Sequence, residues 1–126
     1  MVLMKVYVAS KTKHAGKWLA LRASGLAVNS TWIDEAGVGE SACFIDLWIR
    51  CVREASRADA LLLYVEPGDV LKGALVEVGA ALGCGVPVHV VGAPDGSWVN
   101  HPLVRRHESL EDALACLEVD GWKTER

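Results

Sequence analysis

The chain has 126 residues, of which 52% are apolar and 23% are charged, and its formal net charge is −3. This length and apolar content supply the hydrophobic core of one domain, so a two-domain chain is not expected. The slightly acidic balance argues against duplex nucleic acid as a partner, because binding to phosphates needs a basic surface. The apolar run at the N-terminus is too short for a secretory signal or a membrane span, so we expect a cytoplasmic protein without a membrane partner.

The first expected element is a strand at residues 3–9, which is rich in β-branched residues and ends before Ser10 and Lys11. A helix is expected at residues 15–24, where Gly25 ends it, and a second strand at residues 27–33. An irregular loop at 34–41 is long enough to be functional. The helix expected at 42–58 has one apolar face that should pack on the core, made by Ile45, Trp48, Ile49, Val52 and Ala55.

Residues 60–65 are almost continuously apolar, which is typical of a central parallel strand covered on both faces. A helix at 73–82 and a strand at 86–91 follow, and Ser109 begins the capping box of a last helix. The alternation of strands and helices predicts the α/β class, with a single flavodoxin- or Rossmann-like three-layer domain built on a four- to five-stranded parallel sheet. We expect this domain to cover residues 1–120 and residues 121–126 to form a C-terminal tail.

The loops after the first three strands are the expected place for a ligand, because α/β sheets bind ligands at the carboxyl ends of their strands. Residues 10–11, 32–35 and 66–77 should therefore converge. Glu77 lies about one turn into a helix, next to Gly73 and other small residues that leave room for a ligand. The helix dipole favours its carboxylate as the anion, which suits a group that stabilises or attacks an oxocarbenium-like sugar carbon.

A family resemblance is carried by Lys5-Val6-Tyr7-Val8-Ala9-Ser10, by residues 56–62, and by Gly73-Ala74-Leu75-Val76-Glu77-Val78-Gly79 with its continuation through residue 88. Through these segments the chain resembles the nucleoside 2-deoxyribosyltransferase superfamily, which includes nucleoside 5′-monophosphate N-glycosidases. The resemblance covers most of residues 5–91. It implies that Glu77 is the catalytic nucleophile, that Tyr7 lies beside Glu77 and orients it, and that the protein is a homo-oligomer, because family members share sites between subunits.

Further residues are candidates for binding a nucleoside or nucleotide. Trp32 is suited to stacking on a base and Asp34 to binding ribose hydroxyl groups, while Lys11 and Lys72 offer positive charge to a phosphate. Each of them also has a plain structural interpretation as a core or surface residue. The complete set of expected substrate-binding residues is Ser10, Lys11, Trp32, Asp34, Asp69, Lys72 and Gly73.

The sequence thus predicts an enzyme that cleaves or exchanges an N-glycosidic bond. It does not separate hydrolase from transferase, since water and a second base attack the same intermediate. Cys51 and Leu71 stand where family members have polar site residues, which leaves open a nucleotide-binding module without catalysis, and an NAD-cleaving glycosidase is a further alternative. No cofactor and no metal are expected, because the cysteines and histidines show no metal-ligand spacing and the glycine fingerprints of dinucleotide and ATP sites are missing.

Overall fold

The structure, a computed structural model, describes residues 4–36 and 43–122. In this part of the chain four parallel strands form one sheet in the order β1-β2-β3-β4. The strands are β1 (Val6–Ala9), β2 (Ala60–Tyr64), β3 (Val88–Val91) and β4 (Val104–His107). The helices are α1 (Ala15–Ala23), α2 (Phe44–Arg57), α3 (Gly73–Gly83) and α4 (Leu110–Val119), with short 3₁₀ helices η1 (Thr12–His14), η2 (Thr31–Asp34) and η3 (Ser97–Asn100).

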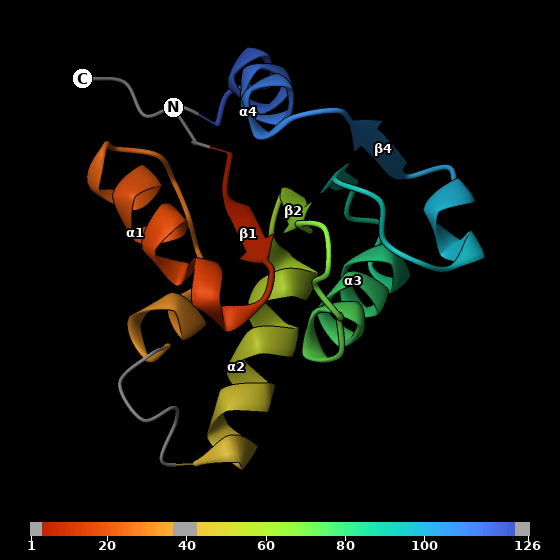
Figure 1. The fold of residues 1–126 in the computed structure, drawn as a ribbon. Coiled ribbons are helices and arrows are strands. Elements are labelled where there is room, and N and C mark those ends of the chain that lie inside the picture. Colours follow the sequence, from red (N-terminus) through yellow and green to blue (C-terminus); the bar gives the residue numbers. More distant parts are fainter. Residues whose placement is uncertain (1–3, 37–42, 123–126) are drawn as a thin grey trace.

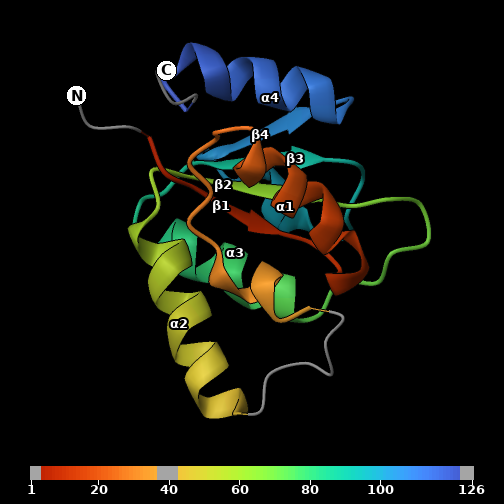
Figure 2. The ribbon, with the colours of Figure 1, turned by 90° about the vertical axis from the view of Figure 1, so that its left-hand side faces the viewer.

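The sheet lies between two helical layers, with α1 and α4 on one face and α2 and α3 on the other (Figures 1 and 2). Strands β1 and β3 are buried along their whole length, as expected of parallel strands covered on both sides. The predicted α/β class and three-layer architecture are therefore confirmed. Within the described ranges, no helix has the length and apolar character needed to cross a lipid bilayer.

The prediction of a strand at residues 27–33 is wrong over most of that range. Val28 forms an isolated parallel bridge to Val6, and residues Thr31–Asp34 form η2. Two side chains explain the change, because the backbone groups of Val8 are taken by the Ser30 hydroxyl, which accepts from Val8 N at 2.7 Å, and by Trp32, whose Nε1 donates to Val8 O at 2.8 Å. These bonds satisfy the edge of β1 without a second strand.

The apolar face expected to bury α2 is mostly exposed. Ile45 is 76% exposed and Ile49 is 53% exposed, whereas Cys51 and Ala55 are buried. The helix extends beyond the sheet, so only its C-terminal half reaches the core (Figure 2). Its helical period was predicted correctly, but most of the apolar face is not buried by residues 4–36 and 43–122.

The packed part of the domain extends further toward the C-terminus than the sequence indicates, and it contains an additional strand. Strand β4 has no counterpart among the expected elements. Its two central residues are exposed and its two end residues are half-buried, so it lacks the apolar pattern of a buried strand. Trp122, expected to lie in a tail, is fully buried, and its Nε1 donates to Ala27 O at 2.9 Å. The packed domain therefore extends at least to Trp122. The remaining expected tail, residues 123–126, and the expectations for residues 1–3 and 37–42 lie outside the described residues.

Candidate active site

Glu77 lines a pocket of about 190 Å³ at the carboxyl end of β1, between η2, α2 and the start of α3. Its side chain comes from the second turn of α3, and the residue is only 7% exposed. Among the expected substrate-binding residues, Ser10, Lys11, Trp32, Lys72 and Gly73 line the same pocket. Three loops that are distant in the sequence thus meet around one buried carboxyl group.

Burial raises the pKa of Glu77, whereas its position near the start of a helix favours the anion. Loss of hydration raises its pKa to about 7, the neighbouring Tyr7 hydroxyl opposes part of this rise, and the negative charge of Glu54 adds to it. The sequence argument from the helix dipole predicted an anion, but desolvation outweighs the dipole here. Near neutral pH the carboxyl group is therefore present in both forms.

Tyr7 lies beneath this pocket in β1 and is fully buried. Its hydroxyl faces the Glu77 carboxyl and the Cys51 thiol, and burial, followed by the charge of Glu77, raises its pKa far above the ordinary value. The same burial raises the pKa of Cys51 to about 11. Within the described residues, neither Tyr7 Oη nor Glu77 Oε2 has a partner that meets the distance and angle criteria of a hydrogen bond. Tyr7 therefore stays a hydroxyl group that can donate to Glu77 once the carboxylate forms.

The Trp32 segment is held against α2 by a network of charged side chains. Glu54 accepts hydrogen bonds from Thr31 N at 3.0 Å and from Thr31 Oγ1 at 2.8 Å. Arg50 donates to Thr31 Oγ1 at 2.7 Å and pairs with Glu35 at 2.6 Å. Together with the indole bond to β1, these contacts set the position of the Trp32 ring at the pocket.

Trp48 and Leu47 are pocket residues that the sequence analysis did not assign to the site, and Cys51, which the resemblance aligns with a polar site residue of the family, also lines the pocket. Trp48 and Cys51 are three positions apart on α2 and therefore share one face of the helix. The Trp48 ring lies directly against Gly73, where an added Cβ would stand only 2.8 Å from Cη2. Gly73 thus allows the indole to approach α3, a role that spacing alone does not reveal.

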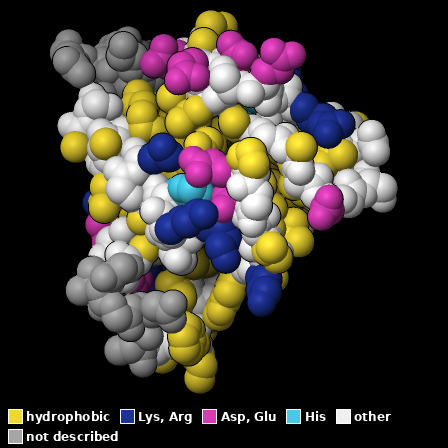
Figure 3. Space-filling view, viewed as in Figure 1, with side chains coloured by type: hydrophobic (Ala, Val, Ile, Leu, Met, Phe, Trp, Pro, Cys, Tyr) yellow, Lys and Arg dark blue, Asp and Glu magenta, His cyan; other side chains and the backbone are white. Residues whose placement is uncertain are grey.

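Two expected site residues lie elsewhere. Asp34 is outside the pocket and forms a bidentate salt bridge with Arg22 of α1, in which the two guanidinium nitrogens donate to the two carboxylate oxygens at 2.6 and 3.0 Å. Asp69 contacts His14 Nε2 at 2.9 Å and Lys13 Nζ at 2.9 Å, and it accepts from Glu66 N. These bonds hold the pKa of Asp69 well below its usual range. Figure 3 shows acidic, basic and histidine side chains gathered near the middle of this face.

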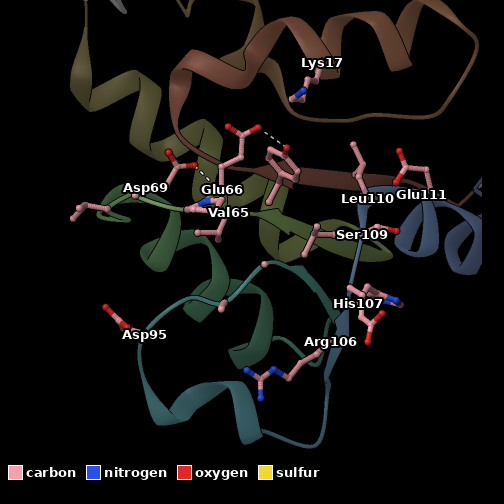
Figure 4. Close-up of a pocket in the computed structure, with 18 residues that line it drawn as sticks. Lys17, Val65, Glu66, Asp69, Asp95, Arg106, His107, Ser109, Leu110 and Glu111 are labelled. Carbon is pink, nitrogen blue, oxygen red and sulfur yellow. Dashed lines mark hydrogen bonds between the residues drawn. The ribbon is translucent and has the colours of Figure 1, made fainter.

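Asp69 instead lines a second, larger cavity of about 1080 Å³, which opens at the carboxyl ends of β2, β3 and β4. Lys17 borders it from α1 and Arg106 from β4, with Glu66 and Glu111 among the other lining groups (Figure 4). Tyr64 Oη donates to Glu66 at 2.5 Å in the same region. This cavity is the larger of the two, but Glu77 and Tyr7 are not part of its lining.

The structure is similar to that of the CMP N-glycosidase BcmB from Clostridium botulinum, with a TM-score of 0.57 and 12% sequence identity. The match covers 91% of this chain and 98% of that protein. The two chains share one fold. At the level of the fold, this confirms the resemblance drawn from the sequence. No family model matches the chain, and no curated protein matches its sequence.

The pocket combines groups that suit chemistry at a sugar carbon. A carboxyl group with a pKa of about 7 provides an anion at physiological pH, and a buried hydroxyl beside it can hold that anion in place. Lys11 and Lys72 add two positive charges to the lining, and the two tryptophans Trp32 and Trp48 add flat apolar surfaces. A ligand with an anionic group, a sugar and a planar base matches this composition.

Proposed function

We propose that this protein cleaves or exchanges the N-glycosidic bond of a nucleoside or nucleotide, with Glu77 as the nucleophile. The observation that carries the proposal is the buried carboxyl group of Glu77 in a pocket that also contains Lys11, Lys72, Trp32 and Trp48. The similarity in fold to a CMP N-glycosidase supports it.

In the proposed reaction, a carboxylate oxygen of Glu77 forms a bond to the anomeric carbon while the carbon–nitrogen bond breaks. The bonding electron pair leaves with the base, which takes up a proton. Tyr7 donates a hydrogen bond to the carboxylate and orients it toward the sugar. Water or a second base then attacks the glycosyl intermediate and releases Glu77, so a hydrolase and a transferase differ in this last step.

The other pocket residues bind the substrate in this proposal. Trp48 and Trp32 hold the base, and Lys11 and Lys72 hold a 5′-phosphate, so a nucleoside monophosphate uses more of the pocket than a nucleoside does. Ser10 shapes the sugar end; its hydroxyl donates to Lys11 O and accepts from Trp18 Nε1.

Incubation with a panel of nucleosides, their 5′-monophosphates and NAD, with and without an added free base, tests the activity. We expect chromatography to show release of the base or formation of an exchanged nucleoside, and at least about a thousandfold loss of this rate in Glu77→Gln. Glu66→Gln changes a carboxyl group in the other cavity and is the matched control, expected to stay active. An active Glu77→Gln variant would refute the role of Glu77, and nicotinamide release alone would favour the NAD-cleaving alternative.

A binding module without catalysis is the second candidate, and one observation favours it. Cys51 and Leu71, which replace polar site residues of the family, both line the pocket around Glu77. This candidate predicts that a nucleotide raises the unfolding temperature without being converted. Stabilisation without any turnover across the whole panel would therefore replace the enzymatic proposal.

We also infer that the protein forms a homo-oligomer through α2. Apolar side chains gather at the lower end of Figure 3, where α2 lies. Trp48 of this helix also lines the pocket. The exposed members are Phe44, Ile45, Trp48, Ile49 and Val52. Light scattering after gel filtration should show an oligomer that Ile45→Lys dissociates, whereas Val119→Lys on α4 leaves it intact. A monomeric protein at micromolar concentration would contradict this inference.

A further inference from the structure

Two histidines and a cysteine meet far from Glu77, at the corner formed by β3, β4 and α4. His89 lies in β3, His107 ends β4, and Cys116 is in the second turn of α4. In the sheet His107 pairs with Val91, two residues after His89, so both imidazoles leave the same face. This is the face that α4 covers, and α4 brings the thiol to them (Figure 2).

The three side chains are close enough to share one metal ion. One nitrogen of each imidazole and the Cys116 sulfur all lie within 4.8 Å of one another. His89 Nδ1 is 2.9 Å from His107 Nε2, and the two rings are nearly parallel, with 10° between their planes. A tetrahedral zinc ion, with bonds of about 2.0–2.1 Å to nitrogen and 2.3 Å to sulfur, needs these atoms roughly 3.3–3.6 Å apart. Small side-chain movements therefore suffice.

The two imidazoles lie in a partly desolvated environment. Burial lowers the pKa of His89 to about 4, and burial also lowers the pKa of His107. A buried and a half-buried imidazole that face each other also form a single N–H···N hydrogen bond in the absence of a metal, so the position of the cysteine sulfur distinguishes the two interpretations.

The charges around the cluster have opposite signs. Arg105 donates to Cys116 Sγ at 3.5 Å, and its positive charge opposes a cation at this place. Asp112 and Asp120 act on His107 and His89 respectively, and their negative charges offset that of Arg105. A cysteine that binds zinc does so as a thiolate, and that charge would add to the charges of the two aspartates.

We propose that His89, His107 and Cys116 form a zinc site that ties α4 to strands β3 and β4. Two imidazoles and one thiolate are ligands that zinc prefers over magnesium or calcium. No fourth histidine, cysteine or carboxylate joins the cluster in residues 4–36 and 43–122, so water takes the remaining position. His107 also borders the larger cavity, which puts the cluster next to solvent. The ligands come from three separate elements, which is why the sequence spacing predicted no metal site.

Titration of the full chain, under reduction and after treatment with a chelator, tests the site. Zinc is added in competition with a chromophoric chelator, and Co²⁺ is added in a parallel experiment as a spectroscopic probe. We expect one equivalent of zinc per chain, a higher unfolding temperature with zinc, and a sulfur-to-cobalt charge-transfer band. Cys116→Ser should remove that band and weaken zinc binding by at least about tenfold.

Cys84→Ser is the matched control, because Cys84 is an exposed cysteine outside the cluster, and it should bind both metals like the wild type. His107→Gln provides a second variant at a partly exposed ligand, with circular dichroism to verify the fold. The proposal is overturned if the chain binds neither metal at micromolar concentration, or if Cys116→Ser retains the charge-transfer band. None of these readouts depends on glycosidase activity.

Discussion

The raised pKa of Glu77 makes protein stability depend on pH in a direction that a single variant can isolate. In the unfolded chain this carboxyl group has its ordinary pKa of 4.5, and in the folded protein burial raises it to about 7. The folded state therefore binds more protons than the unfolded state between these two values. Stability that the neutral carboxyl contributes is fully present below pH 4.5 and is lost as the pH rises through 7.

The magnitude follows from the two pKa values. At about 1.36 kcal/mol for each pKa unit, ionisation of the buried Glu77 costs the folded state roughly 3 kcal/mol, of which about 2.5 kcal/mol falls between pH 5 and pH 8. Glu77→Gln has a similar shape and no charge to bury. Relative to the wild type, the variant should therefore gain about 2.5 kcal/mol of unfolding free energy over this pH range.

Urea unfolding of both proteins, followed by tryptophan fluorescence at several pH values from 5 to 8, measures this difference. Contributions from groups common to both proteins largely cancel in the comparison. Glu118→Gln, which removes an exposed carboxyl group of α4, is the control and should differ from the wild type equally at every pH. A Glu77→Gln difference that stays constant within about 0.5 kcal/mol, or that changes in the opposite direction, would refute the assigned burial of the carboxyl group.

Three further predictions use other contacts of the described residues. For the proposed enzyme, kcat/KM should rise with pH through about 7 as Glu77 ionises in the free protein, and a profile already flat from pH 5 upward would contradict a nucleophile in this environment. Gly73→Ala places a Cβ 2.8 Å from the ring of Trp48 and should lower kcat/KM at least about tenfold with unchanged circular dichroism; unchanged kinetics would mean that the ring does not hold the substrate. Gly92→Ala, at a φ of 105° and with its Cβ only 2.1 Å from a backbone carbonyl oxygen, should destabilise the fold by at least about 2 kcal/mol in chemical unfolding, whereas Gly16→Ala, which has open space around it, should not.

The fold was largely predictable because its central strands and helices have patterns that local sequence determines. The continuous apolar run of β2 and the small-residue helix α3 were found close to their observed bounds. The edge of the sheet was not predictable in the same way. At residues 27–33 a strand-like composition is overridden by Ser30 and Trp32, whose side chains bond to Val8 across 22 and 24 positions of the sequence.

The convergence of loops around Glu77 followed from topology, since the carboxyl ends of parallel strands lie at one edge of the sheet. The partners of individual charged residues did not follow from it. Asp34 pairs with Arg22, and Asp69 pairs with His14. Both contacts join loops and helices whose relative positions depend on tertiary packing. A charged residue in a loop at this edge of the sheet can therefore either bind a ligand or pair with another side chain of the protein, and only its neighbours in space distinguish the two roles.

Glu77 shows why protonation is harder to predict from sequence than position. Its place near the start of α3 is a local property, and the helix dipole acting there favours the anion by at most about 1–2 kcal/mol. The opposing term comes from the layers packed around it, in which Tyr7 of β1 and Cys51 of α2 displace water from the carboxyl group. Because desolvation is the larger of the two, the same glutamate that looks like a permanent anion in the sequence becomes a group that titrates near neutral pH. In the proposed reaction, such a carboxyl group would be ionised easily enough to react and would remain poorly hydrated, which would keep its oxygen atoms available to an electron-poor sugar carbon.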